Sequence, residues 1–327
     1  MENGVRAVSI SREGQYFAAG GIKWVGFFSR DRVTPIWMYR SNFFKEDVNS
    51  LTVSGDGESL VVGVERAYLH YFAANKSSPL WSLSTIGPVL TVSVSYRGEY
   101  VAAGVFEGVI YLLDRSGKLL WNQSAGSPSA ILSVSISRDG EYMVAGSSNS
   151  KLMLFSRASS MPLWIFEDND SIRSVSISDD GRYIAAGGNN SNIYLFERGS
   201  SKPIWSYKAN GPIRSVYLSP DGSHLAAGSL DQKVYYFARS NPSPLWTYQT
   251  GGIVVCVATS ENGSYCCAGS SDRNAYFFDL NGSLIWAHKT NFIVSSISLS
   301  GDGTAAAAGS GNEIYLLVPD RASKTSG

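Results

Sequence analysis

Residues 172–207 read IRSVSISDDGRYIAAGGNNSNIYLFERGSSKPIWSY and contain four short segments with the pattern of β-strands. In the first segment, IRSVSIS, side chains alternate between two faces and β-branched residues are frequent, which is typical of a strand. This alternation predicts Arg173, Val175 and Ile177 on one face, and Ile172 on the other face together with two serines.

The rest of this stretch predicts three more strands that run antiparallel to one another. The pair Asp180-Gly181 predicts a tight hairpin turn, because glycine tolerates a positive φ. Residues 183–187, 193–197 and 203–207 then form the second, third and fourth strands, separated by polar turns. The proline of the fourth segment suits the start of a strand or an edge, because proline donates no hydrogen bond to a sheet.

The same pattern recurs along the whole chain. The hairpin-turn glycine returns every 40 to 43 residues, at Gly14, Gly57, Gly98, Gly140, Gly181, Gly222, Gly263 and Gly303. A tryptophan marks the fourth segment of seven units, at Trp37, Trp81, Trp121, Trp164, Trp205, Trp246 and Trp286. Internal repeats of this period are typical of propellers, in which each repeat forms one blade.

Four short strands repeated eight times, without helical periodicity, predict an all-β, eight-bladed β-propeller over residues 1–320. We expect the blades to start near residues 5, 48, 89, 131, 172, 213, 254 and 294, and residues 321–327 to form a polar tail or linker. Small pairs such as Ala185-Ala186 recur in the second strands, where they allow twisted blades to pack face to face. A β-helix needs much shorter repeats and is far less favoured.

The eighth unit differs from the others, because it lacks the tryptophan segment. It ends at residues 314–320, IYLLVPD, before the polar tail. The sequence therefore predicts a last blade without its outer strand, which residues preceding position 1 in a longer chain would supply. A last blade with three strands is the alternative.

The composition restricts the classes of partner. The 327 residues include 27 Lys and Arg and 27 Asp and Glu, so the chain has no broad electrostatic attraction for nucleic acid or an anionic membrane. No run of about 18 apolar residues occurs, which predicts no direct membrane insertion. The sequence does not fix the compartment. The 52 serines and the 17% of charged residues fit many extracytoplasmic β-proteins, so an extracytoplasmic or cell-surface location is favoured.

Two stretches resemble known propeller families. SVSISRDGEYMVAGSSNSKLMLF, residues 133–155, looks like the first three strands of a WD40 blade, although no Gly-His precedes the first strand and no Trp-Asp closes the third. LLDRSGKLLWNQS, residues 112–124, looks like the tryptophan-docking segment of PQQ-like (quinoprotein-like) blades. The resemblance covers residues 4–318, extends to uncharacterised archaeal propeller proteins, and implies the fold rather than a function.

We call the face that carries the turns between second and third strands and the loops between blades the top face. Loops on a rigid scaffold often carry function. The loop after Trp37 is longer than its equivalents and contains Phe43 and Phe44, which we predict to anchor a partner. The alternative is that both side chains pack onto blade 1 or 2.

Three arginines are predicted close to the channel mouth, at the start of the innermost strands. Arg6, Arg173 and Arg214 occupy this position in blades 1, 5 and 6. Guanidinium groups gathered there predict an anionic ligand or a carboxylate-bearing partner. The alternative is that each arginine pairs with a local acid such as Asp170 or is solvated.

The turns between second and third strands supply further candidates. Arg66, Phe106, Asp231 and Arg273 combine charge with an exposed aromatic ring, which is typical of interfaces. Solvated turns without a partner have the same composition.

The three cysteines, Cys256, Cys266 and Cys267, are too few for a disulfide framework and are not spaced as zinc ligands. Cys266 and Cys267 occupy the Ala-Ala positions of their second strand, where a free cysteine acts as a small apolar residue. The resemblance to quinoproteins implies an alternative in which this pair forms a vicinal disulfide against a cofactor. The acidic run at residues 167–170 lacks the ligand spacing of an EF-hand. We therefore predict no metal and no cofactor.

These observations favour a non-catalytic binding scaffold, expected to be a monomer, that recognises a protein, peptide or glycan through its top-face loops. The alternative from a different class is an extracytoplasmic quinoprotein-type enzyme. The sequence offers no cluster of titratable residues that would support this chemistry.

Overall fold

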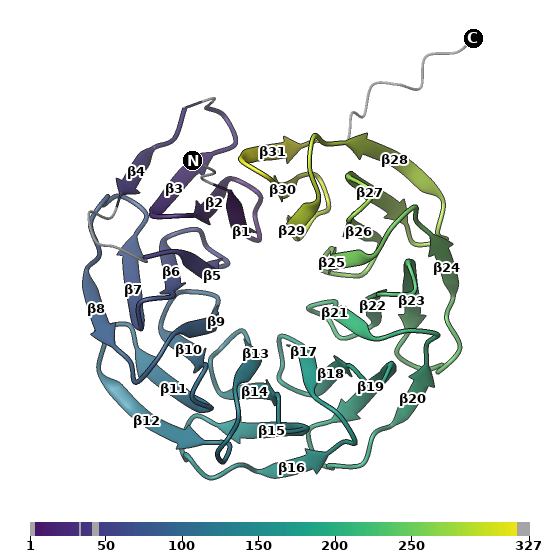
Figure 1. Cartoon of the computed structure of the whole chain (residues 1–327), viewed down its shortest axis with the longest axis horizontal. Helices are drawn as coiled ribbons and strands as arrows, with labels where there is room; N and C mark the ends of the chain where they lie inside the picture. The colour runs from purple at the N-terminus through teal and green to yellow at the C-terminus, as the bar shows by residue number, and fades with distance from the viewer. Residues whose placement is uncertain (1–3, 33, 41–45, 319–327) are drawn as a thin grey trace.

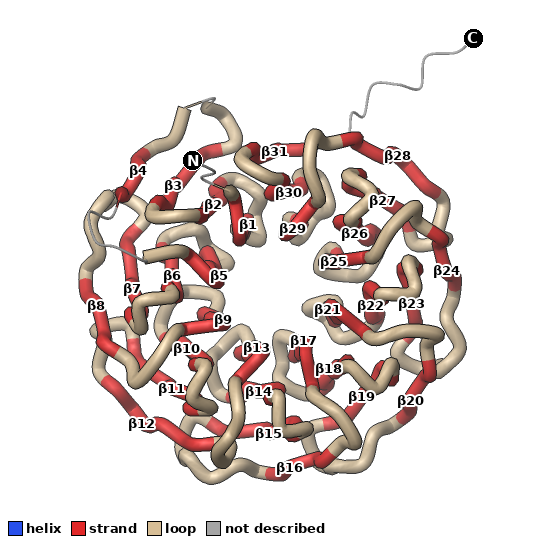
Figure 2. Tube along the Cα trace, in the orientation of Figure 1, coloured by secondary structure: helices blue, strands red, loops and turns tan. Residues whose placement is uncertain are grey.

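The computed structural model describes residues 4–32, 34–40 and 46–318, which form eight antiparallel sheets around a central axis (Figure 1). Seven sheets have four strands, and the described residues of the last sheet form three. This part of the chain is strands and loops without helices, so none of its segments is a helix that could span a membrane (Figure 2). The prediction of an all-β, eight-bladed propeller is confirmed, and within the described residues its last blade lacks an outer strand, as predicted.

The strands of each blade follow one another from the axis outwards. Blades 1 and 2 consist of β1 (Val5–Ile10), β2 (Tyr16–Gly21), β3 (Trp24–Ser29), β4 (Trp37–Arg40), β5 (Val48–Val53), β6 (Ser59–Val64), β7 (Tyr68–Ala73) and β8 (Trp81–Ser84). Blades 3 and 4 consist of β9 (Val89–Val94), β10 (Tyr100–Val105), β11 (Val109–Asp114), β12 (Leu119–Ser124), β13 (Ile131–Ile136), β14 (Tyr142–Ser147), β15 (Lys151–Ser156) and β16 (Trp164–Glu167).

The second half of the ring repeats this arrangement. Blades 5 and 6 consist of β17 (Ile172–Ile177), β18 (Tyr183–Gly188), β19 (Asn192–Glu197), β20 (Trp205–Lys208), β21 (Ile213–Leu218), β22 (His224–Ser229), β23 (Lys233–Ala238) and β24 (Trp246–Gln249). Blades 7 and 8 consist of β25 (Val254–Thr259), β26 (Tyr265–Ser270), β27 (Asn274–Asp279), β28 (Leu284–Lys289), β29 (Val294–Leu299), β30 (Ala306–Ser310) and β31 (Glu313–Leu317).

The apolar core lies between neighbouring blades, and small residues in the second strands make this packing possible. Ala185 and Ala186 of β18 are completely buried. A Cβ atom on Gly187 would lie 2.5 Å from Cγ2 of Ile213 in the next blade, closer than atoms in contact can come. The innermost strand of one blade therefore packs directly on the backbone of its neighbour.

Each innermost strand begins with a β-bulge, which overturns one prediction from the sequence. In blade 5, Ile172 pairs with Gly188 and Ser174 with Gly187, so Arg173 is an extra residue. The bulge moves Ile172 onto the face of Val175 and Ile177, and all three belong to one apolar cluster. The prediction that Ile172 shares a face with the serines is wrong, because strict alternation does not hold across a bulge. The same register shift occurs in all eight blades.

Side-chain hydroxyls of the innermost strands tie the blades together around the channel. Each accepts a hydrogen bond from a backbone N–H of an adjacent blade, at 2.9–3.3 Å. Six acceptors form one level (Ser50, Thr91, Ser133, Ser174, Ser215 and Ser296), and five form a second (Ser9, Ser93, Ser135, Ser176 and Ser298). The repeated serines of SVSIS thus satisfy backbone donors that face the channel.

The tryptophans dock each blade onto the next at the periphery. Trp205 packs against Phe237 of blade 6 with ring centroids 5.4 Å apart, and its indole N–H donates to the carbonyl of Arg239 at 2.7 Å. The equivalent pairs are Trp37 with Ala74, Trp81 with Arg115, Trp121 with Arg157, Trp164 with Arg198 and Trp246 with Leu280. Each of these tryptophans completes the interface with the following blade.

Candidate functional site

The top face is built by hydrogen bonds between the two kinds of loop. The backbone N–H of Phe106 donates to the carbonyl of Pro88 at 2.9 Å, and that of Leu230 donates to Pro212 at 2.9 Å. The turn between second and third strands is therefore fixed to the loop that enters the same blade. Residues in these two loops form one continuous rim around the channel mouth.

The β-bulges place one residue of each blade on the top side of the innermost strands. These residues are Arg6, Asn49, Leu90, Leu132, Arg173, Arg214, Val255 and Ser295. A bulge redirects the side chain of the extra residue, so this ring is separate from the serines that join the blades. Its three cations belong to blades 1, 5 and 6.

Arg6 is neutralised locally. Its Nη2 lies 3.2 Å from Oδ2 of Asp47, and its Nη1 donates to Oδ1 of Asn49 at 3.4 Å. This arginine therefore follows the alternative of pairing with a local acid.

Arg173 and Arg214 differ from Arg6, because no carboxylate lies within ion-pair distance of either among residues 4–32, 34–40 and 46–318. Arg173 is half-buried and donates from Nε to Oδ1 of Asn189 at 3.3 Å. Burial lowers the pKa of Arg173, and the positive charge of neighbouring Arg214 lowers it further. Anionic oxygen groups are the ligands that match guanidinium donors, so the pair keeps the environment that the sequence predicts for an anion site.

The other top-face candidates have different environments. Phe106 is 59% exposed. Arg66 and Arg273 are exposed as well, and Arg273 is a turn residue with a φ of 71°. Asp231 accepts hydrogen bonds from the Tyr235 hydroxyl at 2.6 Å and from a backbone N–H, so it stabilises its own blade. Phe43 and Phe44 lie outside the described residues.

The bottom face carries the hairpin turns between first and second strands, and one short motif builds all of them. The serine that follows the first strand accepts a hydrogen bond from the N–H five residues later, at 2.9–3.1 Å, as between Ser178 and Tyr183. The residue after this serine varies between blades. It is Arg12, Gly55, Tyr96, Arg138, Asp179, Pro220, Glu261 and Gly301 in blades 1 to 8.

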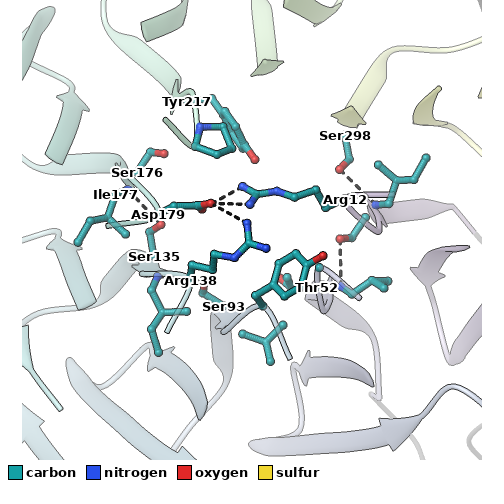
Figure 3. A pocket seen from close by; sticks show the side chains of 18 of the residues that line it. Arg12, Thr52, Ser93, Ser135, Arg138, Ser176, Ile177, Asp179, Tyr217 and Ser298 are labelled. Carbon is teal, nitrogen blue, oxygen red and sulfur yellow. Dashed lines mark hydrogen bonds and ion pairs between the residues drawn. The ribbon is translucent and has the colours of Figure 1, made fainter. Parts of the chain in front are cut away.

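Four of these variable residues form an ionic cluster across the channel, with Tyr96 beside it, and Figure 3 shows its members Arg12, Arg138 and Asp179. Arg12 of blade 1 reaches Asp179 of the opposite blade, where Nη2 donates to Oδ1 at 2.9 Å and Nη1 donates to Oδ2. Arg138 also donates to Oδ2 of Asp179, at 3.3 Å, and its Cζ lies 3.9 Å from the ring centre of Tyr96. Glu261 lies 3.7 Å from Arg12. We call Arg12, Tyr96, Arg138, Asp179 and Glu261 the cross-channel cluster.

The acids of this cluster stabilise the charged form of Arg12. Although burial lowers the pKa of Arg12, its hydrogen bond to Asp179 and the charges of Asp179 and Glu261 raise that pKa above its ordinary value. The channel beside the cluster is a cavity of about 370 Å³, and serines of the second level, such as Ser135 and Ser176, line it together with Tyr217. This cluster was not predicted from the sequence. The available signal was a position that varies inside an otherwise constant turn motif.

A closed ring of backbone hydrogen bonds supports the cluster. Each turn donates one N–H to a carbonyl in the turn of the next blade, at 2.7–3.2 Å, from Arg12 to Gly55 and onwards to the last bond, from Gly301 back to Arg12. In blades 2 and 6 the donors are the next residues, Asp56 and Asp221, and in blade 6 the reason is that Pro220 has no N–H. All eight blades are thus joined at the bottom mouth.

The cysteines and the acidic run at residues 167–170 lie where their side chains have structural contacts. Cys266 and Cys267 are free thiols, completely buried in β26, as predicted for small apolar residues. Burial raises the pKa of both thiols. Asp168, in the acidic run, accepts hydrogen bonds from Asn190 and from the Tyr194 hydroxyl. Among the described residues, no three His, Cys, Asp or Glu side chains gather as metal ligands would.

The family assignment rests on the repeats. The model of the family described as outer membrane protein assembly factor BamB, which has PQQ-like repeats, matches residues 24–248, more than half of the chain. The chain belongs to this PQQ-like propeller family. Within this PQQ-like propeller, residues 242–279 also match the model of the WD domain, G-beta repeat. Both resemblances noted in the sequence are therefore confirmed.

Similar solved structures extend over the entire ring. The computationally designed Ika8 protein matches with a TM-score of 0.84 and 13% identity, over 97% of both chains. Sqt1 of Chaetomium thermophilum, solved bound to the N-terminus of the ribosomal protein L10, matches with a TM-score of 0.83 and 16% identity, again over 97% of both chains. No curated protein matches this PQQ-like propeller by sequence. At these identities the likeness concerns the fold.

Proposed function

We propose that the chain is a non-catalytic binding platform whose top mouth holds an acidic segment of a partner protein or peptide. The observation that carries this proposal is the pair Arg173 and Arg214, two adjacent guanidinium groups without a carboxylate partner among the described residues. Carboxylates match the donor geometry of guanidinium groups, and hydrogen bonds between charged groups are the strong ones.

The surroundings of the pair favour a peptide over a small ion. Apolar side chains stand exposed on the same rim, among them Phe106 at 59%, Leu230 at 39% and Phe292 at 50%. Interfaces combine such apolar contacts with a few charged anchors. The similar propeller Sqt1 was solved with a protein N-terminus bound, which supports a peptide ligand for this architecture.

The proposal includes no chemical step. The buried thiols of Cys266 and Cys267 pack within and between blades as alanines do in other blades, and the carboxylate of Asp179 is held by two arginines. These groups therefore have structural partners, which supports recognition as the role of the molecule.

A peptide-display selection tests the proposal. A random 12-residue library is selected on the immobilised chain and on the variant Arg173→Ala/Arg214→Ala. We expect peptides rich in Asp and Glu to be enriched on the wild type and to bind the double variant at least tenfold more weakly, as measured by fluorescence anisotropy. Arg97→Ala is the matched control, because Arg97 is an exposed arginine in a bottom-face turn.

Two outcomes oppose the proposal. If the selected peptides were not enriched in Asp and Glu, the guanidinium pair would not be what binds the partner. Equal affinity of the wild type and the double variant would place the binding site elsewhere.

A further inference from the structure

The outer side of blade 8 is unlike that of any other blade. In the part of the chain that the structure describes, β31 has no strand on its outer side, whereas the third strand of every other blade pairs with a fourth. The central residues of β27 are buried, but every residue of β31 is partly exposed. The backbone N–H and C=O groups on this edge are therefore open to a further strand.

A groove lies beside this edge, between blades 8 and 1. Its volume is about 370 Å³, and its lining combines apolar walls with a charged end, from Phe17, Phe28, Arg30, Asp31, Arg32, Ile314 and Leu316. Phe17 and Phe28 stack with centroids 4.9 Å apart and form one wall. The volume is within the range of small-ligand sites.

In other blades, the equivalent place between two blades is filled by a tryptophan. Trp246 lies between Tyr236 of its own blade and Phe278 of the next, with centroid distances of 4.9 and 5.1 Å, and donates its N–H to the carbonyl of Leu280 at 3.0 Å.

The strand registers give the equivalent positions at the interface of blades 8 and 1. Leu316 pairs with Ala307 as Tyr236 pairs with Ala226, and Phe28 pairs with Phe17 as Phe278 pairs with Cys266. The carbonyl of Arg30 then takes the place of the Leu280 carbonyl. The groove is the eighth tryptophan slot, continuous with the blade interface and without a tryptophan among the described residues.

We propose that this groove binds an extended, tryptophan-bearing segment of a partner protein, which adds to β31 as a fourth strand. The backbone of the segment pairs with the open edge of β31, and its indole ring enters between Leu316 and Phe28. The indole N–H donates to the carbonyl of Arg30. Strand addition of this kind takes its affinity from main-chain hydrogen bonds and its specificity from side-chain pockets.

The test uses a probe taken from the chain itself. The labelled peptide KPIWSYK, residues 202–208, carries the tryptophan strand of blade 5. We expect it to bind the full chain in a one-to-one complex by fluorescence anisotropy. The same peptide with alanine in place of tryptophan should bind at least tenfold more weakly. No binding, or equal binding of both peptides, would overturn the proposal without requiring any variant of the protein.

Two variants locate the binding site. Leu316→Arg places a charge in the groove and should weaken peptide binding at least tenfold. Leu284→Arg is the matched control, because Leu284 is 40% exposed on the neighbouring strand β28. Equal binding by wild type and Leu316→Arg, with both folded by circular dichroism, would refute the site.

Sedimentation velocity without peptide completes the test. A dimer that Leu316→Arg dissolves would mean that a second copy fills the groove, and would overturn the assignment to a partner protein. A monomer in both cases supports it. Binding here does not involve Arg173 or Arg214, so either proposal can fail while the other stands.

Discussion

Replacing Asp179 by alanine is the most direct test of the cross-channel cluster. The carboxylate receives two hydrogen bonds from Arg12 and one from Arg138. Its removal leaves two cations facing each other at the bottom mouth, with Glu261 as their remaining acid, 3.7 and 4.0 Å away.

The size of the effect follows from burial. Removing one partner of a fully buried ion pair costs about 3–5 kcal/mol. The Arg12 side chain is 15% exposed and that of Asp179 is 28% exposed, so solvent screens part of the interaction. We therefore expect a loss of about 2–3 kcal/mol in the free energy of unfolding. The unfolding entropy of 327 residues, at about 2.1 cal/mol/K each, is about 0.7 kcal/mol/K, so Tm should fall by about 3–4 °C.

Differential scanning calorimetry measures the change in Tm, and urea titration measures the free energy. Glu13→Ala is the control, because Glu13 is an exposed acid in a bottom-face turn. Its Tm should stay within 1 °C of the wild type, within the range of surface substitutions. A double-mutant cycle with Arg12→Ala should give a coupling energy of about 1–3 kcal/mol. A coupling energy near zero would refute the view that the ions across the channel stabilise the ring.

Three further predictions concern other parts of the ring. Trp205→Phe keeps a ring in the slot but loses the N–H donated to Arg239, and we expect it to cost about 1 kcal/mol in urea unfolding; an unchanged midpoint would contradict the docking role. Cys266 and Cys267 are buried with raised pKa values, so Ellman's reagent should modify them only after denaturation, and rapid modification of the native chain would show that the blade opens. Burial lowers the pKa of His70, so the unfolded state binds its proton more readily and stability should fall as pH drops below about 6.5. His70→Phe should flatten that slope in urea titrations between pH 5 and 7.5, whereas an identical slope would assign the pH dependence to other groups.

The repeat made the fold predictable from sequence. A turn glycine marks the first hairpin of all eight repeats, and a tryptophan marks the fourth strand of seven of them. A closed ring is the arrangement that buries both faces of each blade. The β-bulge was not predictable from alternation, because the first strand of blade 5 reads as regular. Only the pairing of Ile172 with Gly188 and of Ser174 with Gly187 reveals the extra residue.

The candidate site was predictable only for residues that occupy equivalent positions in neighbouring repeats. Arg173 and Arg214 occupy the same place in adjacent repeats, so their proximity follows from the repeat itself. Arg12 and Asp179 are 167 residues apart in the chain and meet because the closed ring sets the width of the channel. Nothing local in either turn encodes that width. The Asp47 partner of Arg6 was missed for a similar reason, since it belongs to the loop entering the next blade.

The ring of backbone hydrogen bonds at the bottom mouth runs in one rotational sense, from each blade to the next. Its peptide dipoles therefore circulate around the axis and largely cancel along it. The cross-channel cluster adds two positive and two negative side chains, which also sum to zero. At the opposite mouth, Arg173 and Arg214 place two positive charges on adjacent blades. In a chain with 27 acidic and 27 basic residues, the two entrances of the channel thus differ in the charges beside the axis, with paired ions at the bottom mouth and, among the described residues, two arginines without a carboxylate partner at the top mouth.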